Sequence, residues 1–226
     1  MKKDKSLKIL FLYPNLSMSA LVPYAISILS AVLKKDGFKN IDLFDATFYK
    51  SCEESKDARG VRLGQVKPFN FEERKAEIKT TDMYEDFVFK VKQMKPDLIA
   101  ASIVEDTYPI FLKFMSAIKR QKIPTVVGGP FPTNASEIVA LSDSIDFICK
   151  GDGEGAMLDL CNALNQNEEP TKIPNLIIKK NGVVVEQNPV REAVDLNKLP
   201  MQDLVIFEPD SLFRPMMGEI YRFAPL

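Results

Sequence analysis

Short apolar runs alternate with helical apolar spacings along the first two thirds of the chain. The runs typical of buried strands are Lys8–Leu12, Ile41–Phe44, Leu98–Ser102, Thr125–Val127 and Asp146–Cys149. Between them, apolar residues recur every three or four positions, which is the period of a helix that buries one face. Strands that alternate with helices in this way predict an α/β fold, with an open, mainly parallel five-stranded sheet and helices on both faces. The short crossovers favour the flavodoxin-like strand order 2-1-3-4-5.

The predicted helices fill the intervals between these strands. The first begins near Val22 and should end at Lys34 and Lys35, because cations in the last turn and Gly37 just beyond it form a usual helix stop. The other helices are expected over Tyr84–Met94, Tyr108–Lys119, Glu137–Leu141 and Glu154–Leu164. The segment Gly128–Thr133 is expected to be a loop.

Two segments depart from this rhythm. Residues 50–80 are dense in mixed charge, and this insertion is more typical of a solvated excursion at the sheet edge than of a binding lid. Near the end, two β-prone runs flank Asn181-Gly182, a strong hairpin signal. We therefore expect an α/β domain over residues 1–168 and a hairpin with an extended, proline-spaced arm over residues 169–226. The arm should pack on another surface, and its apolar end suggests a fragment of a longer protein.

Composition removes several classes of chemistry. Thirty Lys and Arg against thirty-one Asp and Glu leave a net charge of −1, which does not favour nucleic acid as a partner. The chain has no histidine, so it supplies neither a histidine base nor an imidazole metal ligand. Its three cysteines match no zinc or iron–sulfur spacing. Without a membrane-length apolar run or a signal-peptide cleavage site, the sequence predicts a cytoplasmic protein with no membrane partner.

Glycines mark the ends of two predicted strands. Gly128-Gly129 would end one strand without side chains, so that a bulky ligand could press against bare backbone. Gly151 to Gly155, reading GDGEG, would open the last helix with free N–H groups. Each motif alone is more typical of a tight turn. Their position on adjacent strand ends, where such sheets bind ligands, favours a binding site.

Other ligands of this fold fit less well. A receiver domain needs an acidic pair after the first strand and a phosphoacceptor aspartate after the third, where this chain has Tyr13-Pro14 and Ser102-Ile103-Val104. A dinucleotide site needs glycines in the first loop, which has none. A flavin mononucleotide is a weak alternative, since Ser17 and Ser19 are few hydroxyls and Pro14 removes an amide donor.

The order of short motifs resembles the N-terminal cobalamin-binding domain of cobalamin-dependent radical SAM enzymes. The motifs are KILFLYPN, PDLIAASIVEDTYP, IPTVVGGPFPTNASE, DFICKGDGEGA and IPNLIIKKNG. The broader cobalamin fold is marked by D-x-H-x-x-G, then S-x-L, then G-G. Ser102-Ile103-Val104 and Gly128-Gly129 stand for the last two, and Tyr13-Pro14-Asn15 replaces the first. The radical SAM branch is similar in lacking that histidine.

The resemblance implies a cobalamin whose own base is detached and whose tail passes the G-G strand. It assigns the tail to Ser102, Gly128 and Gly129, and the tail or corrin edge to Gly151, Asp152, Gly153 and Glu154. It places at the corrin Tyr13, Pro14 and Asn15, and also Val104, Glu105, Asp106 and Thr107. A solvated helix start, capped by Asp106 or Thr107, is an equally good interpretation of that last loop.

The resemblance also implies a partner. A radical SAM domain of the same parent chain would hold a [4Fe–4S] cluster and S-adenosylmethionine, and the parent would carry out radical-based methyl transfer or rearrangement. The cluster-binding C-x-x-x-C-x-x-C spacing does not occur here, so the chain alone should not turn over. The rival interpretation is a ligand-sensing or structural α/β module in which both glycine motifs serve only as turns.

Overall fold

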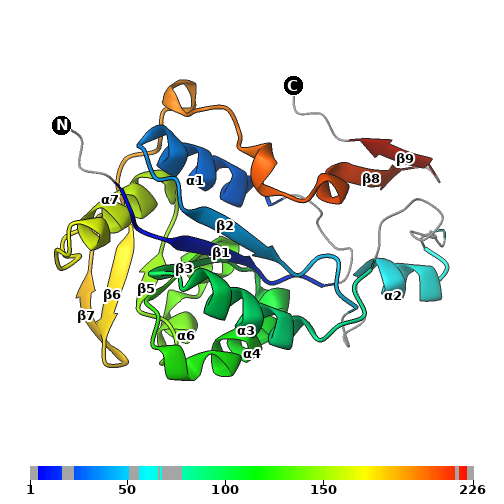
Figure 1. Cartoon of the computed structure of the whole chain (residues 1–226), viewed down its shortest axis with the longest axis horizontal. Coiled ribbons are helices and arrows are strands. Elements are labelled where there is room, and N and C mark those ends of the chain that lie inside the picture. The colour runs from blue at the N-terminus through cyan, green and yellow to red at the C-terminus, as the bar shows by residue number, and fades with distance from the viewer. Residues whose placement is uncertain are drawn as a thin grey trace.

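The computed structural model describes residues 5–16, 23–50, 56–65, 67, 78–216 and 219–222. Its centre is a seven-stranded sheet in the order β2-β1-β3-β4-β5-β6-β7 (Figure 1). The strands are β1 Ile9–Tyr13, β2 Ile41–Asp45, β3 Leu98–Ser102, β4 Thr125–Gly128, β5 Phe147–Cys149, β6 Leu176–Lys180 and β7 Val183–Gln187. The first five are parallel, which confirms the predicted order 2-1-3-4-5. The hairpin β6–β7 extends the same sheet, because β6 pairs antiparallel with β5.

The helices follow the predicted alternation. They are α1 Tyr24–Lys35, α2 Lys56–Arg62, α3 Met83–Met94, α4 Tyr108–Ala117, α5 Pro130–Asn134, α6 Ser136–Ala140 and α7 Glu154–Asn165. Helix α5 occupies a segment that the sequence predicted to be a loop. Pro130 at its first position supplies a helical φ, and Asn134 Nδ2 donates to the Pro130 carbonyl over 2.8 Å. Helix α2 lies in the charged insertion that the sequence predicted to be a solvated excursion at the sheet edge.

The C-terminal arm holds more structure than its sequence indicated. It contains short 3₁₀ turns at Leu196–Lys198, Leu204–Ile206 and Pro209–Leu212. It also contains a small separate sheet of β8 Phe213–Met216 and β9 Glu219–Arg222, which the prediction of an extended arm did not include. This hairpin was not predicted because β8 contains Pro215, and proline argues against a strand except at a sheet edge. Each strand of a two-stranded sheet is an edge, so the proline is tolerated there.

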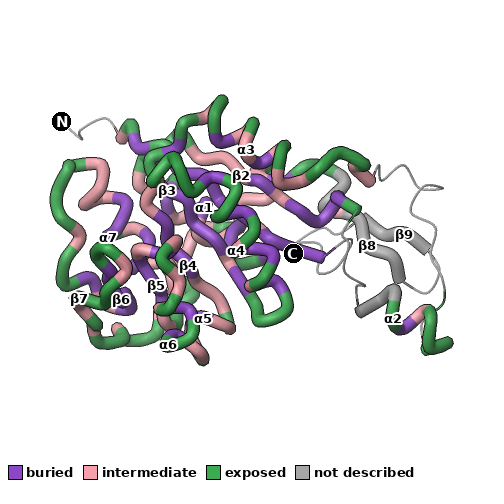
Figure 2. The backbone as a smooth tube through the Cα atoms, turned by 90° about the horizontal axis from the view of Figure 1, so that it is seen from below, coloured by how far each residue is buried: buried purple, intermediate pink, exposed green. Residues whose placement is uncertain are grey.

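The sheet separates two apolar cores. Successive side chains of a strand point to opposite faces, so neighbours such as Leu10 and Phe11 enter different cores. One core lies under α3 and α4 and is rich in packed phenylalanines, including Phe87 and Phe114 with ring centroids 5.1 Å apart. The other lies under α1 and α7. Figure 2 shows the central strands buried within this arrangement. No helix in the described segments is long and apolar enough to cross a membrane.

The arm packs across the outer side of α1 (Figure 1). The Asp203 amide donates to the Ser27 carbonyl over 3.1 Å. Its Oδ2 accepts from Ser30 Oγ and from Lys34 Nζ, each over 2.5 Å. Phe207 then enters the α1/α7 core with 6% of its surface exposed. The predicted packing of the arm on another surface is therefore met by α1, which explains why its two serines are fully buried.

Candidate cofactor site

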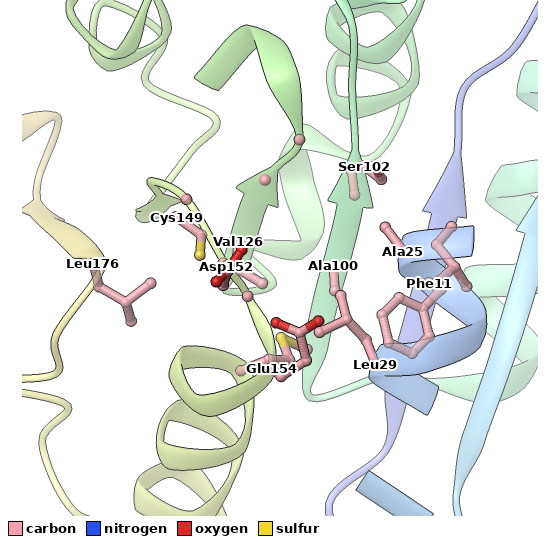
Figure 3. A pocket seen from close by; sticks show the side chains of 17 residues that line it. Phe11, Ala25, Leu29, Ala100, Ser102, Val126, Cys149, Asp152, Glu154 and Leu176 are labelled. Carbon is pink, nitrogen blue, oxygen red and sulfur yellow. The ribbon is translucent and has the colours of Figure 1, made fainter. Parts of the chain in front are cut away.

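A cavity of about 210 Å³ lies between the sheet and helices α1 and α7 (Figure 3). Its sheet wall comes from the carboxyl halves of β1, β3, β4 and β5, and its helix wall includes Ala25, Leu29 and Met157. Pockets that enclose a whole drug-sized ligand measure about 300–1,000 Å³. The cavity therefore suits a ring-sized part of a larger ligand, which would continue toward the carboxyl edge of the sheet.

The cavity exists because side chains on this face become smaller toward the carboxyl edge. Along β3 they pass from Leu98 through Ala100 to Ser102, and along β4 from Val126 to Gly128. Alternate residues of a strand share a face, so these positions all point toward α1 and α7. The helices lie on the larger side chains and span the smaller ones. A hollow remains where the side chains are shortest.

Half of the predicted site residues line this cavity. They are Ser102, Gly128, Gly129, Gly151, Asp152, Gly153 and Glu154. These include all the residues that the resemblance assigned to the tail. A hydroxyl at a strand end can bond its own backbone, but the Ser102 hydroxyl makes no hydrogen bond within the described part of the chain.

The two adjacent glycines Gly128 and Gly129 have different structural roles. Gly129 has φ +109°, and a Cβ there would lie 2.7 Å from the Ile103 carbonyl oxygen. The fold therefore requires glycine at this position, whatever it binds. A Cβ on Gly128 would meet nothing closer than the Cys149 Cβ at 3.6 Å, an ordinary contact. Since the protein itself has room for a side chain at Gly128, its bare backbone leaves space inside the cavity.

Glu154 gives the cavity an unused polar atom. It stands at the first position of α7, and its Oε2 is buried without a hydrogen-bond partner. Figure 3 shows its carboxyl group among the side chains that line the cavity. A buried acceptor without a partner is unfavourable by about 1–3 kcal/mol, so a ligand that brings a donor would relieve this cost. Nearby, burial and then the charge of Glu154 raise the pKa of Cys149 to about 12, so its thiol stays neutral.

The GDGEG turn is fixed from outside by residues that flank the hairpin, Asn175 before β6 and Arg191 after β7. Asn175 is fully buried, and its Nδ2 donates to the Lys150 carbonyl over 2.7 Å. Its Oδ1 accepts from Arg191 Nε over 3.2 Å, and Arg191 Nη2 donates to Asp159 over 2.8 Å. A Cβ on Gly155 would lie 1.9 Å from Arg191 Nη1, so the third glycine of the motif makes room for the guanidinium. No sequence motif indicated this network of hydrogen bonds between Asn175, Arg191 and Asp159.

The other predicted site residues do not line the cavity. Asn15 is bound within the protein: its Nδ2 donates to Thr47 Oγ1 over 2.8 Å, and its Oδ1 accepts from the Leu16 amide over 3.0 Å. Thr107 Oγ1 accepts from the Val104 amide and donates to the Val104 carbonyl, which closes the 3₁₀ turn Glu105–Thr107. It makes no cap hydrogen bond to α4, so the helix cap of the alternative interpretation is not observed at Thr107. The rest of this set comprises Tyr13, Pro14, Val104, Glu105 and Asp106. Their contacts with a corrin stay predictions.

Sequence reasoning missed the helix wall and the floor of the cavity. Ala25 and Leu29 line the cavity from α1, and Phe11, Ala100 and Met157 also line it. Apolar residues of this kind carry no chemical motif and looked like ordinary core. The available signal was the alternation itself, since Phe11, Ala100, Ser102 and Gly128 fall on one face of the sheet.

A second polar group lies at the same edge of the sheet, beyond β2. Asp45 Oδ1 accepts from the Thr47 amide over 2.9 Å and from the Thr47 hydroxyl, while its Oδ2 is buried without a partner. Burial raises the pKa of Asp45 to about 6, against the opposing effect of the Thr47 bonds. Within the described residues, no group of three or more acidic, cysteine or histidine side chains could hold a metal ion.

Comparison with known proteins supports the resemblance that the motifs indicated. Residues 63–161 match the model of the B12 binding domain. A 104-residue stretch is 27% identical to the anaerobic magnesium-protoporphyrin IX monomethyl ester cyclase of Synechocystis sp. (strain ATCC 27184 / PCC 6803 / Kazusa). The matched stretch covers 44% of this chain and 21% of that protein, so the chain matches only about a fifth of the curated relative's length.

Two solved structures share the fold over most of this chain. The radical S-adenosylmethionine methyltransferase TsrM from Kitasatospora setae, solved with cobalamin and a [4Fe–4S] cluster, matches 86% of this chain and 31% of its own, with TM-score 0.58 and 20% identity. The cobalamin-dependent S-adenosylmethionine radical enzyme OxsB, solved with aqua-cobalamin, matches 89% and 25%, with TM-score 0.60 and 16% identity. Our chain is thus similar to the cobalamin-dependent radical SAM enzymes in fold, and residues 63–161 match the B12 binding domain.

Proposed function

We propose that this chain binds cobalamin and places its nucleotide tail in the cavity between the sheet and helices α1 and α7. The observation that carries the proposal is the bare wall at Gly128, which the packing of the protein does not require and which lies within the stretch matched to the B12 binding domain. The apolar floor of the cavity suits an aromatic ring.

Each part of the site has a task in this proposal. Ser102 bonds the tail through its free hydroxyl, and Gly128 and Gly129 leave its path open. The turn from Gly151 to Glu154 borders the tail or the corrin edge, while the loops from Tyr13 to Asn15 and from Val104 to Thr107 face the ring. The chain has no histidine, so it offers no imidazole as a lower ligand. The base-off form of cobalamin is taken into this proposal from the family resemblance.

The wider function follows from the relatives. Bound cobalamin supplies a cobalt centre that can carry and transfer a methyl group. We propose that this chain positions that cofactor for a radical SAM domain holding a [4Fe–4S] cluster and S-adenosylmethionine, in radical-based methyl transfer or rearrangement. The names of TsrM and OxsB and the length of these proteins, three to four times the matched part, support that partner. The chain itself should not turn over, and we expect it to act in the cytoplasm.

A spectroscopic titration tests the proposal. Hydroxocobalamin added to the purified chain should give a saturable change of the visible spectrum toward the base-off form. Gly128→Leu should abolish that change because the new side chain fills the cavity, whereas Leu141→Phe, at a position 82% exposed on the outside, should bind normally. Absence of binding, both in this chain and in the same chain joined to a radical SAM domain, would support the structural-module rival. A yellow protein as purified would indicate a flavin.

A further inference from the structure

The cavity has a chemical preference that goes beyond shape. Its one buried and unpartnered polar atom, among the described residues that line it, is Glu154 Oε2, an acceptor. Arg191 is the cation near this helix start, but it is bonded to Asn175 and Asp159. Ser102 adds a hydroxyl at the carboxyl edge. A group that fills this cavity well must therefore be apolar in its body and offer a hydrogen-bond donor to Glu154.

The chemistry of the lower base decides whether this preference matters. In the proposed function the lower base is detached from cobalt and its tail lies in this cavity, so contacts in the cavity would hold the base. Lower bases differ in their donors: the 5,6-dimethylbenzimidazole of cobalamin, once detached, has an unprotonated ring nitrogen and no N–H. An adenine base carries an exocyclic amino group with two N–H donors.

We infer that the cavity selects cobamides by their lower base, favouring a purine-type base with an N–H donor over dimethylbenzimidazole, with Glu154 as the selecting residue. The inference rests on the proposed function, because it concerns the same cavity and the same class of cofactor. A purine amino group would give Oε2 the partner it lacks, while its rings lie against the apolar floor. Dimethylbenzimidazole would fill the floor but leave the carboxyl group unpaired.

Affinities for three corrinoids test the inference, each followed by the visible spectrum. The probes are adenine-bearing aquocobamide, hydroxocobalamin and aquocobinamide, which lacks the base altogether. A hydrogen bond to a charged acceptor changes affinity by about 10- to 100-fold. We expect the unmodified chain to bind the adenine cobamide at least about tenfold more tightly than hydroxocobalamin, and cobinamide most weakly.

Two variants at Glu154 measure its contribution to the preference for the adenine cobamide. Glu154→Met keeps the size of the side chain and removes the acceptor, so it should weaken the adenine cobamide to the level of hydroxocobalamin and leave cobinamide unchanged. Glu154→Gln keeps a neutral acceptor and should retain part of the preference. It also carries the test if the Met variant fails to fold by circular dichroism. Glu137→Met, on α6 and outside the cavity, is the matched control.

The outcomes separate this inference from the function on which it rests. An equal loss for both complete cobamides in Glu154→Met would mean that Glu154 contacts the ribose or a corrin amide, which both share, and would overturn the inference. A preference for hydroxocobalamin in the unmodified chain would overturn it as well. If the unmodified chain binds none of the three corrinoids, the proposed function itself fails.

Discussion

The two halves of the sheet's carboxyl edge are built in opposite ways. Beyond β1 and β2 the edge is filled: Asn15, Thr47 and Asp45 hydrogen-bond one another in a chain. Beyond β3, β4 and β5 it is hollow, with Gly128 bare and Glu154 unpaired. The parallel register is continuous across both halves, so the difference lies in the side chains rather than in the backbone.

This contrast shows where a ligand contributes to the site. Buried polar groups are usually satisfied within the protein, and the filled half satisfies most of its own. Each half leaves one buried carboxylate oxygen without a partner, Asp45 Oδ2 in the filled half and Glu154 Oε2 in the hollow half, but Glu154 lines the cavity and Asp45 does not. In the proposed function, the ligand in this cavity would supply the partner of Glu154. Tyr13-Pro14-Asn15, the segment found in place of the usual first cobalamin motif, therefore lies in the filled half.

The largest expected effect comes from a methyl group at Gly129, which tests how closely the backbone after β4 packs on the backbone after β3, within the hollow half. Gly129→Ala must place a Cβ at φ +109° and 2.7 Å from the Ile103 carbonyl oxygen. Strain and overpacking together should lower the free energy of unfolding by about 4 kcal/mol. Urea denaturation followed by circular dichroism measures this loss. A change below about 1 kcal/mol would show that the β3–α4 loop yields, and that the glycine is not structurally required.

A rise from acid to neutral pH should destabilise the filled half of the sheet edge through Asp45. Its pKa is raised to about 6, mainly by burial, so the folded state favours the neutral carboxyl group. Stability from this group is complete below the unfolded pKa, near 4, and is lost as pH rises through about 6. The loss amounts to at most about 3 kcal/mol.

The matched variant is Asp45→Asn, which imitates the neutral carboxyl group and does not titrate. Between pH 4 and pH 7 the unmodified chain should lose up to about 3 kcal/mol of stability relative to this variant. Lys79 and Glu208 lie close enough to alter the pKa of Asp45, so the measurements belong at one ionic strength. Parallel pH profiles for the two proteins would mean that Asp45 is solvated and ionised when folded.

Much of the fold was predictable because it repeats one pattern. Apolar runs separated by helical spacings fixed five strands and their helices, and short crossovers indicated the order. The misses have local causes. Helix α5 begins with a Gly-Pro sequence that usually signals a turn, and β8 contains Pro215. The joining of β6 to β5 is a long-range pairing, which no local pattern specifies.

The parts of the site formed by bare backbone could be predicted from the sequence. The parts formed by packed apolar side chains could not. Gly128 and the GDGEG turn are visible in the sequence because grouped glycines at the ends of two adjacent predicted strands stand out as a pattern, although each alone is typical of a turn. Ala25 and Leu29 were not, because a cavity wall and a filled core use the same residues. The role of Gly155 also depended on Arg191, a contact across 36 residues that only the fold reveals.

A third test concerns the contacts that hold the C-terminal arm on α1, the helix that forms a wall of the cavity in the hollow half. Asp203 fixes the arm to the outer side of this helix through Ser30 and Lys34. Asp203→Ala removes a largely buried carboxylate and leaves the Ser30 hydroxyl without its partner, so we expect a loss of about 2 kcal/mol in unfolding free energy. Glu208→Ala, whose bond to Lys79 is exposed, is the control and should cost well under about 1 kcal/mol.

The smallest expected effect on stability separates the two adjacent glycines most sharply. Gly128→Ala adds one methyl group whose nearest neighbour is the Cys149 Cβ at 3.6 Å, and alanine is not strained in a strand. The free energy of unfolding should therefore change by less than about 1 kcal/mol, in contrast to Gly129→Ala. Because the methyl group projects into the cavity, hydroxocobalamin should nevertheless bind several-fold more weakly. A stable variant with unchanged affinity would place the nucleotide tail elsewhere, and a strongly destabilised one would make Gly128 as structural as its neighbour.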